Sequence, residues 1–268
     1  VDDVVIRFAG DSGDGMQLTG GRFTDTTAIV GNDLSTLPDF PAEIRAPAGS
    51  LAGVSAFQIH FSSKDIHTPG DKVDVLVAMN PAALKVHREE LEPGGMLICN
   101  TAAFTKKNLT HAGFESNPLE DKSLDDYFRV YAIDMSSIVK EACADMGLTP
   151  KTVDRTKNLF ALGLLYWIYD RPLDSTKEWL QNKFAKRPEL IDANVKAMEA
   201  GFNYGETTEI FTTRFKVDKA DLPAGTYRNI VGNYAVTLGL VAAAEKSKLP
   251  LFYGGYPITP ASDILHHL

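Results

Sequence analysis

The sequence predicts an α/β protein with a doubly wound, mostly parallel sheet, followed by the start of a second α/β domain. Three observations support this fold class. Strand-like runs alternate with helical patterns up to about residue 147. A glycine-rich turn, residues 10–15, joins the first strand to the first helix. The segment 159–169 is apolar on every face, which is typical of a buried helix rather than a membrane span.

The predicted strands are short runs rich in β-branched and other apolar residues. They are residues 4–8, 54–61, 73–79, 96–99 and 130–133. The helices between them show apolar residues three and four apart. They are expected at 16–30, 81–91 and 136–146, and the first should bury Met16, Gly20, Phe23, Thr27 and Val30. A turn is expected at 92–95.

The second half of the chain changes character. After the buried helix, amphipathic cover helices are expected at 174–184 and 188–202. Residues 205–231 have a turn-rich composition that suits a linker. The rest contains a helix at 234–246, a strand at 249–253 and a helix beginning at Pro260. The predicted domains are therefore 1–204 and 232–268, and the second, being shorter than about 40 residues, is expected to be truncated.

Composition excludes several classes of protein. The 268 residues carry a net charge of −8, and no basic run exceeds two residues, which argues against nucleic-acid binding. The two cysteines, Cys99 and Cys143, lie in apolar segments and form no Cys-x-x-Cys, so the chain by itself should hold neither an iron–sulfur cluster nor a structural zinc. With no membrane or secretory segment recognised, a soluble cytoplasmic protein is expected.

The glycine-rich turn is the first candidate site. Its spacing is G-x-x-G-x-G, which differs from the dinucleotide-binding G-x-G-x-x-G, and no Gly-Lys-Ser/Thr follows. Asp11 and Asp14 would repel a pyrophosphate. Two interpretations stay open for the loop that carries Ser12 and Gly13. It is either a tight βα turn or a loop that docks a polar ligand or a partner.

A second candidate is the Pro- and Gly-punctuated loop 43–53, which contains Arg45 and Ser50. An arginine on a rigid loop at a strand end can clamp an anion. A salt bridge from Arg45 to Glu43 explains the arginine equally well.

The third candidate is the segment YPITPAS, residues 256–262. Thr259 stands where an N-cap belongs, with Pro260 at the first helical position. The Thr259 hydroxyl and the free N–H groups behind it would suit a carboxylate. An ordinary helix cap is the alternative.

Four blocks, in this order, carry a resemblance to a known family. They are GDSGDGMQLTGG (10–21), EIRAPAGSLAGVSAFQIHF (43–61), GNYAVTLG (232–239) and YPITPAS (256–262). Together they resemble the α subunit of 2-oxoacid:ferredoxin oxidoreductases. The most similar type acts on 2-oxoglutarate (2-oxoglutarate synthase) and has a γ domain fused in front of the α domain. The glycine loop differs from the family's commoner GxGGQG.

The resemblance implies an enzyme that converts a 2-oxoacid, coenzyme A and oxidised ferredoxin to acyl-CoA, CO₂ and reduced ferredoxin; the reverse reaction fixes CO₂, as in the reductive TCA cycle. It implies thiamine diphosphate, Mg²⁺ and [4Fe–4S] clusters, held largely by a partner β subunit in an (αβ)₂ assembly. Residues 232–268 would begin the domain that binds the thiamine pyrimidine. A glutamate that activates the pyrimidine and an arginine that holds the substrate are expected beyond Leu268.

The resemblance also implies roles for individual residues. Thr259 would hydrogen-bond the substrate carboxylate, as a catalytic and substrate-binding residue. Tyr256, Pro257 and Ile258 would shape the pocket. A coenzyme A wall or docking loop in the γ-like domain would use Arg45, Ser50, Ser12 and Gly13.

Alternatives to this enzyme remain. The substrate could be pyruvate or a branched-chain 2-oxoacid, because all share the carboxylate site. The domain 1–204 could serve only for docking the β subunit or ferredoxin, or the chain could be a Rossmann-type NAD enzyme. Thermal shifts would separate these classes. NAD should stabilise only a Rossmann-type NAD enzyme, and coenzyme A only a 2-oxoacid:ferredoxin oxidoreductase.

Overall fold

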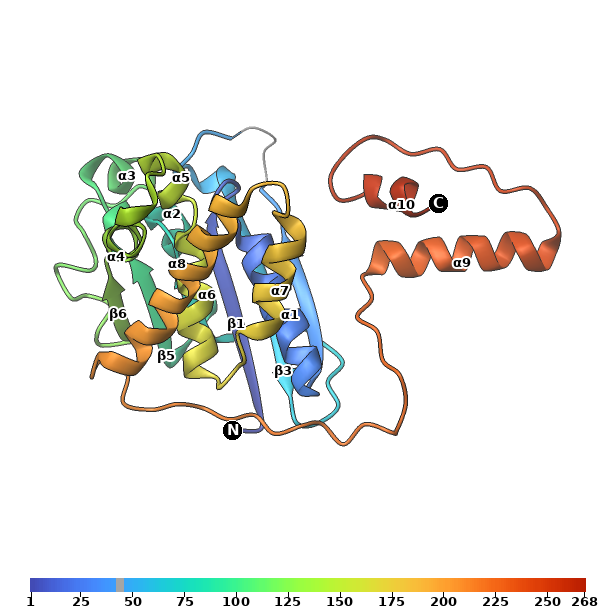
Figure 1. The fold of residues 1–268 in the computed structure, drawn as a ribbon, viewed down its shortest axis with the longest axis horizontal. Helices are drawn as coiled ribbons and strands as arrows, with labels where there is room; N and C mark the ends of the chain where they lie inside the picture. The colour runs from blue at the N-terminus through green and yellow to red at the C-terminus, as the bar shows by residue number, and fades with distance from the viewer. Residues whose placement is uncertain (42–45) are drawn as a thin grey trace. The chain divides into compact units, whose positions relative to one another are not determined.

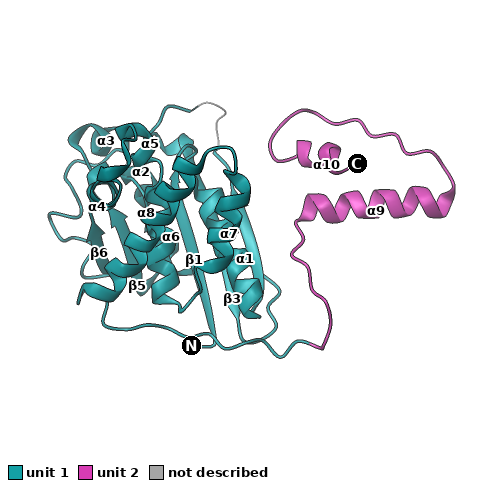
Figure 2. Ribbon diagram, viewed as in Figure 1, with its two compact units in different colours: residues 1–222 teal, residues 223–268 magenta. Residues whose placement is uncertain are grey.

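A computed structural model describes residues 1–41 and 46–268. The chain forms two compact units, residues 1–222 and 223–268 (Figure 2). The first contains all the strands found in the described residues, and the second contains two helices.

The first unit is built on a six-stranded sheet with strand order β2-β3-β1-β4-β5-β6 (Figure 1). The strands are β1 (Asp3–Asp11), β2 (Asp33–Asp39), β3 (Val54–Ser62), β4 (Val73–Ala78), β5 (Leu91–Asn100) and β6 (Arg129–Ile133). Strands β1, β4, β5 and β6 are parallel, whereas β3 runs antiparallel to both β1 and β2. The predicted α/β fold with a mostly parallel sheet is confirmed.

Helices cover both faces of this sheet. They are α1 (Met16–Val30), α2 (Pro81–His87), α3 (Lys106–His111), α4 (Met135–Ala142), α5 (Pro150–Asp154), α6 (Lys157–Ile168), α7 (Asp174–Lys183) and α8 (Pro188–Thr207). Alternate residues of each strand face opposite layers. In β1, Ile6 and Phe8 join a core with α1, α4, α6 and α8, whereas Val5 and Ala9 join a smaller core with α2 and α3.

Helix α6 is the centre of the larger core. From Asn158 to Ile168 every residue is buried, as the apolar run predicts. Gly163 of α6 and Gly201 of α8 let the two backbones come into contact. A Cβ added at Gly163 would lie 1.9 Å from the Met198 carbonyl oxygen. This close approach explains why a glycine interrupts an otherwise bulky helix.

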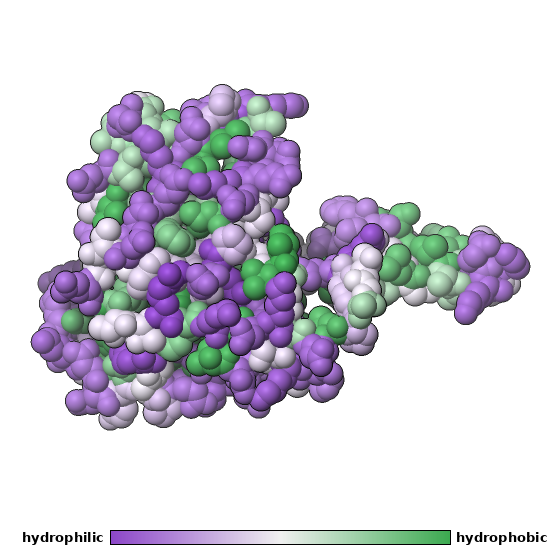
Figure 3. All heavy atoms as spheres, turned by 60° about the horizontal axis from the view of Figure 1, so that its bottom comes forward, coloured by the Kyte–Doolittle hydropathy of each residue, from purple (hydrophilic) through white to green (hydrophobic). Residues whose placement is uncertain are grey.

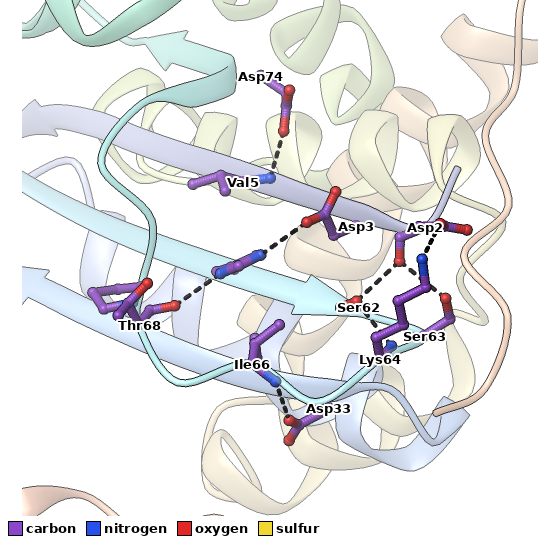
Figure 4. Close-up of polar contacts among 12 residues, drawn as sticks. Asp2, Asp3, Val5, Asp33, Ser62, Ser63, Lys64, Ile66, Thr68 and Asp74 are labelled. Carbon is purple, nitrogen blue, oxygen red and sulfur yellow. Dashed lines mark hydrogen bonds and ion pairs between the residues drawn. The ribbon is translucent and has the colours of Figure 1, made fainter. Parts of the chain in front are cut away.

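The amino end of β1 is fastened by a group of polar contacts (Figure 4). The Asp74 carboxylate accepts from the Val5 N–H at 2.8 Å, and the Asp33 carboxylate accepts from the Ile66 N–H at 2.9 Å. The Asp2 carbonyl oxygen accepts from the Ser63 N–H at 2.9 Å. These bonds hold the connection between β3 and β4 against the sheet, so this acidic group is explained by the fold.

Several sequence predictions are corrected within the first unit. Strand β2 was not expected, because its polar residues and Pro38 give no apolar alternation; it is an edge strand, where proline is tolerated. Residues 92–95 do not separate a helix from a strand but lie inside β5, which already begins at Leu91. Part of segment 205–231 packs on the first unit, since Phe211 and Val217 are buried.

The second unit contains α9 (Gly232–Ser247) and α10 (Ser262–His267), which contact each other. The predicted strand at 249–253 is wrong. Leu249, Leu251 and Phe252 are exposed there, and no other strand pairs with the segment. A strand needs a neighbour for its backbone groups, and the described part of the second unit offers none.

Candidate functional site

The carboxyl edge of the parallel strands is where this topology places a binding site. After β1 the chain moves to β2 and β3, and after β4 it moves to β5 and β6, so β1 and β4 flank the point where the winding reverses. Ligands of doubly wound sheets bind in the crevice outside such a point. The glycine loop follows β1 there. Because β3 is antiparallel, the segment before Val54 reaches the same edge, with Val54 opposite Asp11.

The glycine loop is a tight turn that its own acidic residues hold closed. The Asp14 carboxylate accepts from the Asp11 N–H at 2.9 Å, and the Asp14 N–H donates back to the Asp11 carbonyl oxygen at 2.9 Å. Gly15 has a φ of 78°, and a Cβ there would meet the Asn158 side chain at 2.5 Å. Ser12 and Gly13 lie exposed at the tip of the turn. The two acids therefore have a structural role, and only the tip is free to meet a ligand.

Asp11 joins the glycine loop to the second candidate loop. Its two carboxylate oxygens accept from the Gly49 N–H at 3.1 and 3.0 Å. The neighbouring Ser50 donates its hydroxyl to the Pro47 carbonyl oxygen at 2.7 Å. The structure thus brings Ser50 to the same edge as Ser12 and Gly13. Arg45 lies outside the described residues.

Burial has a measurable consequence at Asp11. It raises the pKa of this carboxyl above its ordinary value of 3.8, and the Gly49 N–H only partly offsets the effect. The pKa of Asp11 is thus higher in the folded protein than in the unfolded chain. At pH values above the folded pKa the ionised carboxylate lowers the free energy of unfolding, and this loss disappears below about pH 3.8.

We therefore expect Asp11→Asn to raise stability at about pH 7 by less than about 1 kcal/mol, because the site is half exposed and an amide oxygen still accepts from Gly49. The gain should shrink as the pH falls towards about 4. Thermal unfolding at both pH values measures it, with the exposed Asp221→Asn as control. A gain that is larger at the lower pH would contradict this interpretation.

Lys157 is a residue that sequence analysis missed. Its Nζ lies 3.3 Å from Asp14 Oδ1 and 3.0 Å from Asp154 Oδ2, and Asp154 also accepts from the Ser136 hydroxyl at 2.8 Å. Burial by itself lowers the pKa of Lys157, but the two carboxylates outweigh it and hold the pKa above its ordinary value. The charged lysine thus ties the glycine loop to the start of α6. The only sequence signal is the three-residue spacing from Asp154 to Lys157.

Asn100 carries a buried polar atom at this edge that has no hydrogen-bond partner in the described part of the chain. Asn100 ends β5 with 1% of its surface exposed, and its Oδ1 has no hydrogen-bond partner among the described residues. Buried polar atoms are nearly always paired with protein or water.

The motif 256–262 lies in the second unit and differs from its prediction. Helix α10 begins at Ser262, and the residue before it, Ala261, makes no side-chain cap. Thr259 is therefore not the N-cap, and Pro260 is not the first helical residue. The turn is closed instead by the backbone, with Ser262 N–H donating to the Ile258 carbonyl oxygen at 3.0 Å.

The motif is joined to the start of α9. Asn233 Nδ2 donates to the Pro260 carbonyl oxygen at 2.9 Å, and the Tyr234 and His267 rings lie 4.9 Å apart. Tyr256 and Ile258 are exposed, as are Pro257 and Thr259. The Thr259 hydroxyl makes no hydrogen bond to any described residue. It is therefore available to a ligand.

No metal site is evident in residues 1–41 and 46–268, where no three His, Cys, Asp or Glu side chains gather as ligands. Cys99 and Cys143 are buried and form no disulfide, and burial raises the pKa of both thiols. None of the helices in these residues is long and apolar enough to cross a bilayer.

Comparison with known proteins gives a consistent result. Residues 5–204 match the family described as pyruvate ferredoxin/flavodoxin oxidoreductase. Over all 268 residues the chain is 54% identical to the 2-oxoglutarate oxidoreductase subunit KorA of Mycobacterium tuberculosis, and it spans 41% of that protein.

Two solved structures are similar as well. One is a 2-oxoglutarate:ferredoxin oxidoreductase from Magnetococcus marinus with 2-oxoglutarate, coenzyme A and succinyl-CoA bound (TM-score 0.72, 25% identity, all of this chain and 41% of that one). The other is the γ subunit of a keto/oxoacid ferredoxin oxidoreductase from Geobacter sulfurreducens (TM-score 0.50, 19% identity, 76% of this chain and 99% of that one). The latter likeness concerns the fold alone.

Proposed function

The chain belongs to the pyruvate ferredoxin/flavodoxin oxidoreductase family of oxidoreductases, and from this premise we propose that it is part of a subunit of a 2-oxoglutarate:ferredoxin oxidoreductase. The proposed enzyme interconverts 2-oxoglutarate, coenzyme A and oxidised ferredoxin with succinyl-CoA, CO₂ and reduced ferredoxin. The observation that carries the proposal is the 54% identity to KorA over the whole chain.

Thr259 is the residue we propose for substrate binding. A hydroxyl donates a short, charge-assisted hydrogen bond to a carboxylate, and the Thr259 hydroxyl is exposed and unbonded within the described chain. Tyr256, Pro257 and Ile258 would form the adjoining wall. The exposed Tyr256 ring offers apolar area for the carbon chain of the substrate.

We propose that different subunits hold different cofactors. Thiamine diphosphate supplies the carbanion chemistry that releases CO₂ from a 2-oxoacid, with Mg²⁺ on its diphosphate. The residues described here include no cluster of metal ligands and no pair of nearby cysteines. As the family resemblance implies, we propose that Mg²⁺ and the [4Fe–4S] cluster are held largely by a β subunit, which passes electrons to ferredoxin.

Coenzyme A is proposed to meet the exposed tip of the glycine loop, Ser12 and Gly13, with Ser50 beside it. The tip has unbonded polar groups and no steric obstruction, since a Cβ added at Gly13 would find no atom within 4 Å.

Because coenzyme A carries several phosphates, we expect Gly13→Asp to raise its KM by about tenfold while kcat stays nearly unchanged. Gly13→Asn adds the same volume without the charge, and is the matched control. Initial-rate kinetics give the KM for coenzyme A of each variant. Equal values for the two variants would exclude a phosphate at this tip.

The remaining assignments concern assembly. We propose a γ-type domain within residues 1–222 and the beginning of a pyrimidine-binding domain at 232–268, in a cytoplasmic (αβ)₂ enzyme. Hydrophobic side chains of the second unit are exposed in Figure 3. On α9 they include Val236, Leu238 and Val241. A helix that is apolar on several faces is normally covered by further structure.

The substrate can be tested directly. The full-length polypeptide and its partner subunit would be purified together without oxygen, and coenzyme A-dependent reduction of methyl viologen measured with 2-oxoglutarate, pyruvate and a branched-chain 2-oxoacid. We expect 2-oxoglutarate to give the highest kcat/KM. Preference for another 2-oxoacid would reassign the substrate, and no turnover with any from a cofactor-replete complex would leave a docking module.

A further inference from the structure

A pocket lies at the end of the sheet opposite the candidate site. It has a volume of about 590 Å³, which is within the range of small-molecule sites. Its lining residues come from the amino ends of β4 and β5 and from the segment before β6. They are Lys72, Arg88, Glu89, Leu91, Pro93, Ser123, Leu124, Tyr127 and Phe128.

An irregularity of β5 builds one wall of this pocket. Val73 pairs with Leu91 but Val75 pairs with Met96, so two steps along β4 match five along β5. This excursion of β5 at 92–95 holds three more residues than the facing part of β4, and Pro93 in it lines the pocket. Such bulges commonly occur beside binding sites.

Hydrogen bonds hold this excursion to the opposite wall. Gly94 N–H donates to the Tyr127 carbonyl oxygen at 2.7 Å, and Arg129 Nε donates to the Gly94 carbonyl oxygen at 2.9 Å. The two walls are thus joined through the backbone. The wall at 92–95 is therefore fixed by hydrogen bonds to the backbone of Gly94.

The lining is apolar at its base and aromatic at its rim. Leu91 and Leu124 are 3% and 5% exposed, and Phe128 packs beside them. The Tyr127 side chain, in contrast, is 65% exposed. A large exposed aromatic ring next to an apolar cavity is suited to stacking on a flat ligand.

The charged groups favour an anion. The pocket lining contains two cationic side chains, Lys72 and Arg88, and one carboxylate, Glu89, although the whole chain has a net charge of −8. Lys72 Nζ donates to the Glu89 backbone carbonyl oxygen at 2.5 Å. The guanidinium of the half-buried Arg88 makes no ion pair or hydrogen bond within the described chain, although its planar fork matches a carboxylate.

We infer that this pocket binds a small organic anion with a flat apolar body, whose carboxylate meets Arg88 and whose ring lies against Tyr127 and Phe128. Within the first unit the pocket is separate from the proposed coenzyme A site, because β4 lies between Lys72 at one end and the glycine-loop edge at the other. The inference does not depend on the proposed reaction.

The test uses 2-naphthoate, a fluorescent aromatic carboxylate, titrated into the full-length polypeptide in its complex. We expect saturable binding that Arg88→Gln weakens by about tenfold, the size of one charge-assisted hydrogen bond. Arg187→Gln removes the same charge from an exposed ion pair elsewhere and should leave binding unchanged. Tyr127→Ala should weaken both 2-naphthoate and its neutral analogue, 2-naphthalenemethanol.

Three results would overturn the inference. One is the absence of saturable binding, and another is equal affinity for the wild type and Arg88→Gln. The third is displacement of 2-naphthoate by 2-oxoglutarate or coenzyme A, which would place the probe in the reaction site instead.

Discussion

Thr259→Val should lower kcat/KM for 2-oxoglutarate by about 10- to 100-fold in the complete enzyme, since a hydrogen bond to a charged group contributes about 1.5–3 kcal/mol. Valine keeps the shape of threonine and removes only the hydroxyl. That hydroxyl bonds to no described residue, so its loss breaks no internal contact. Initial-rate kinetics with methyl viologen as acceptor measure the effect.

Thr259→Ser is the matched control, because it restores the hydroxyl and removes only a methyl group. It should recover most of the activity. If Thr259→Val kept wild-type kcat/KM, the substrate carboxylate would be held by other groups. If Thr259→Ser were as impaired as Thr259→Val, the methyl group rather than the hydroxyl would matter.

Gly163→Ala should strongly destabilise the first unit. The new Cβ would lie 1.9 Å from the Met198 carbonyl oxygen and 2.8 Å from its carbonyl carbon. Backbone atoms cannot move aside as a flexible side chain can, so α6 and α8 would have to separate. Overpacking of this kind costs at least about 1–3 kcal/mol, and here the clash is with main chain in the centre of the core.

Gly21→Ala is the control for this substitution. Gly21 lies in α1, and an added Cβ there would have no neighbour within 4 Å. Alanine favours a helix over glycine by about 1 kcal/mol, so this variant should be neutral or slightly stabilised. Thermal unfolding of the full-length polypeptide would compare the two. Equal melting temperatures would mean that α6 and α8 do not pack as closely as described.

Much of the first unit follows from local patterns. The strand at 73–79 is apolar except for Asp74, and the helix at 16–30 has apolar residues three and four apart. The structure has both elements, as β4 and α1. The complete burial of α6 is also visible in its sequence. These elements face the core, and residues that face the core must be apolar, so their pattern can be recognised in the sequence.

Elements that do not face the core were harder to predict. Strand β2 lies at the sheet edge and is held by backbone pairing with β3, which needs no apolar alternation. The excursion at 92–95 depends on a change of register between β4 and β5. A turn-rich sequence does not show whether it precedes a strand or lies inside one. Both are consequences of tertiary pairing.

The candidate site divides in the same way. The glycine loop was recognised, but the Lys157 contact that holds it joins residues far apart in the chain, and no local pattern predicts such pairs. At Thr259 the capping pattern Thr-Pro predicted a helix start, whereas the backbone turn from Ile258 to Ser262 delays the helix. The proposed role of Thr259 therefore rests on the family resemblance and the availability of its hydroxyl.

The most direct test of the central claim is to detect the acyl product. The complete enzyme, supplied with 2-oxoglutarate, coenzyme A and oxidised methyl viologen, would be analysed for succinyl-CoA by mass spectrometry. Oxidative decarboxylation releases two electrons, so we expect one succinyl-CoA for each pair of viologens reduced. Viologen reduction without succinyl-CoA, or no succinyl-CoA from a cofactor-replete complex, would contradict the proposed function.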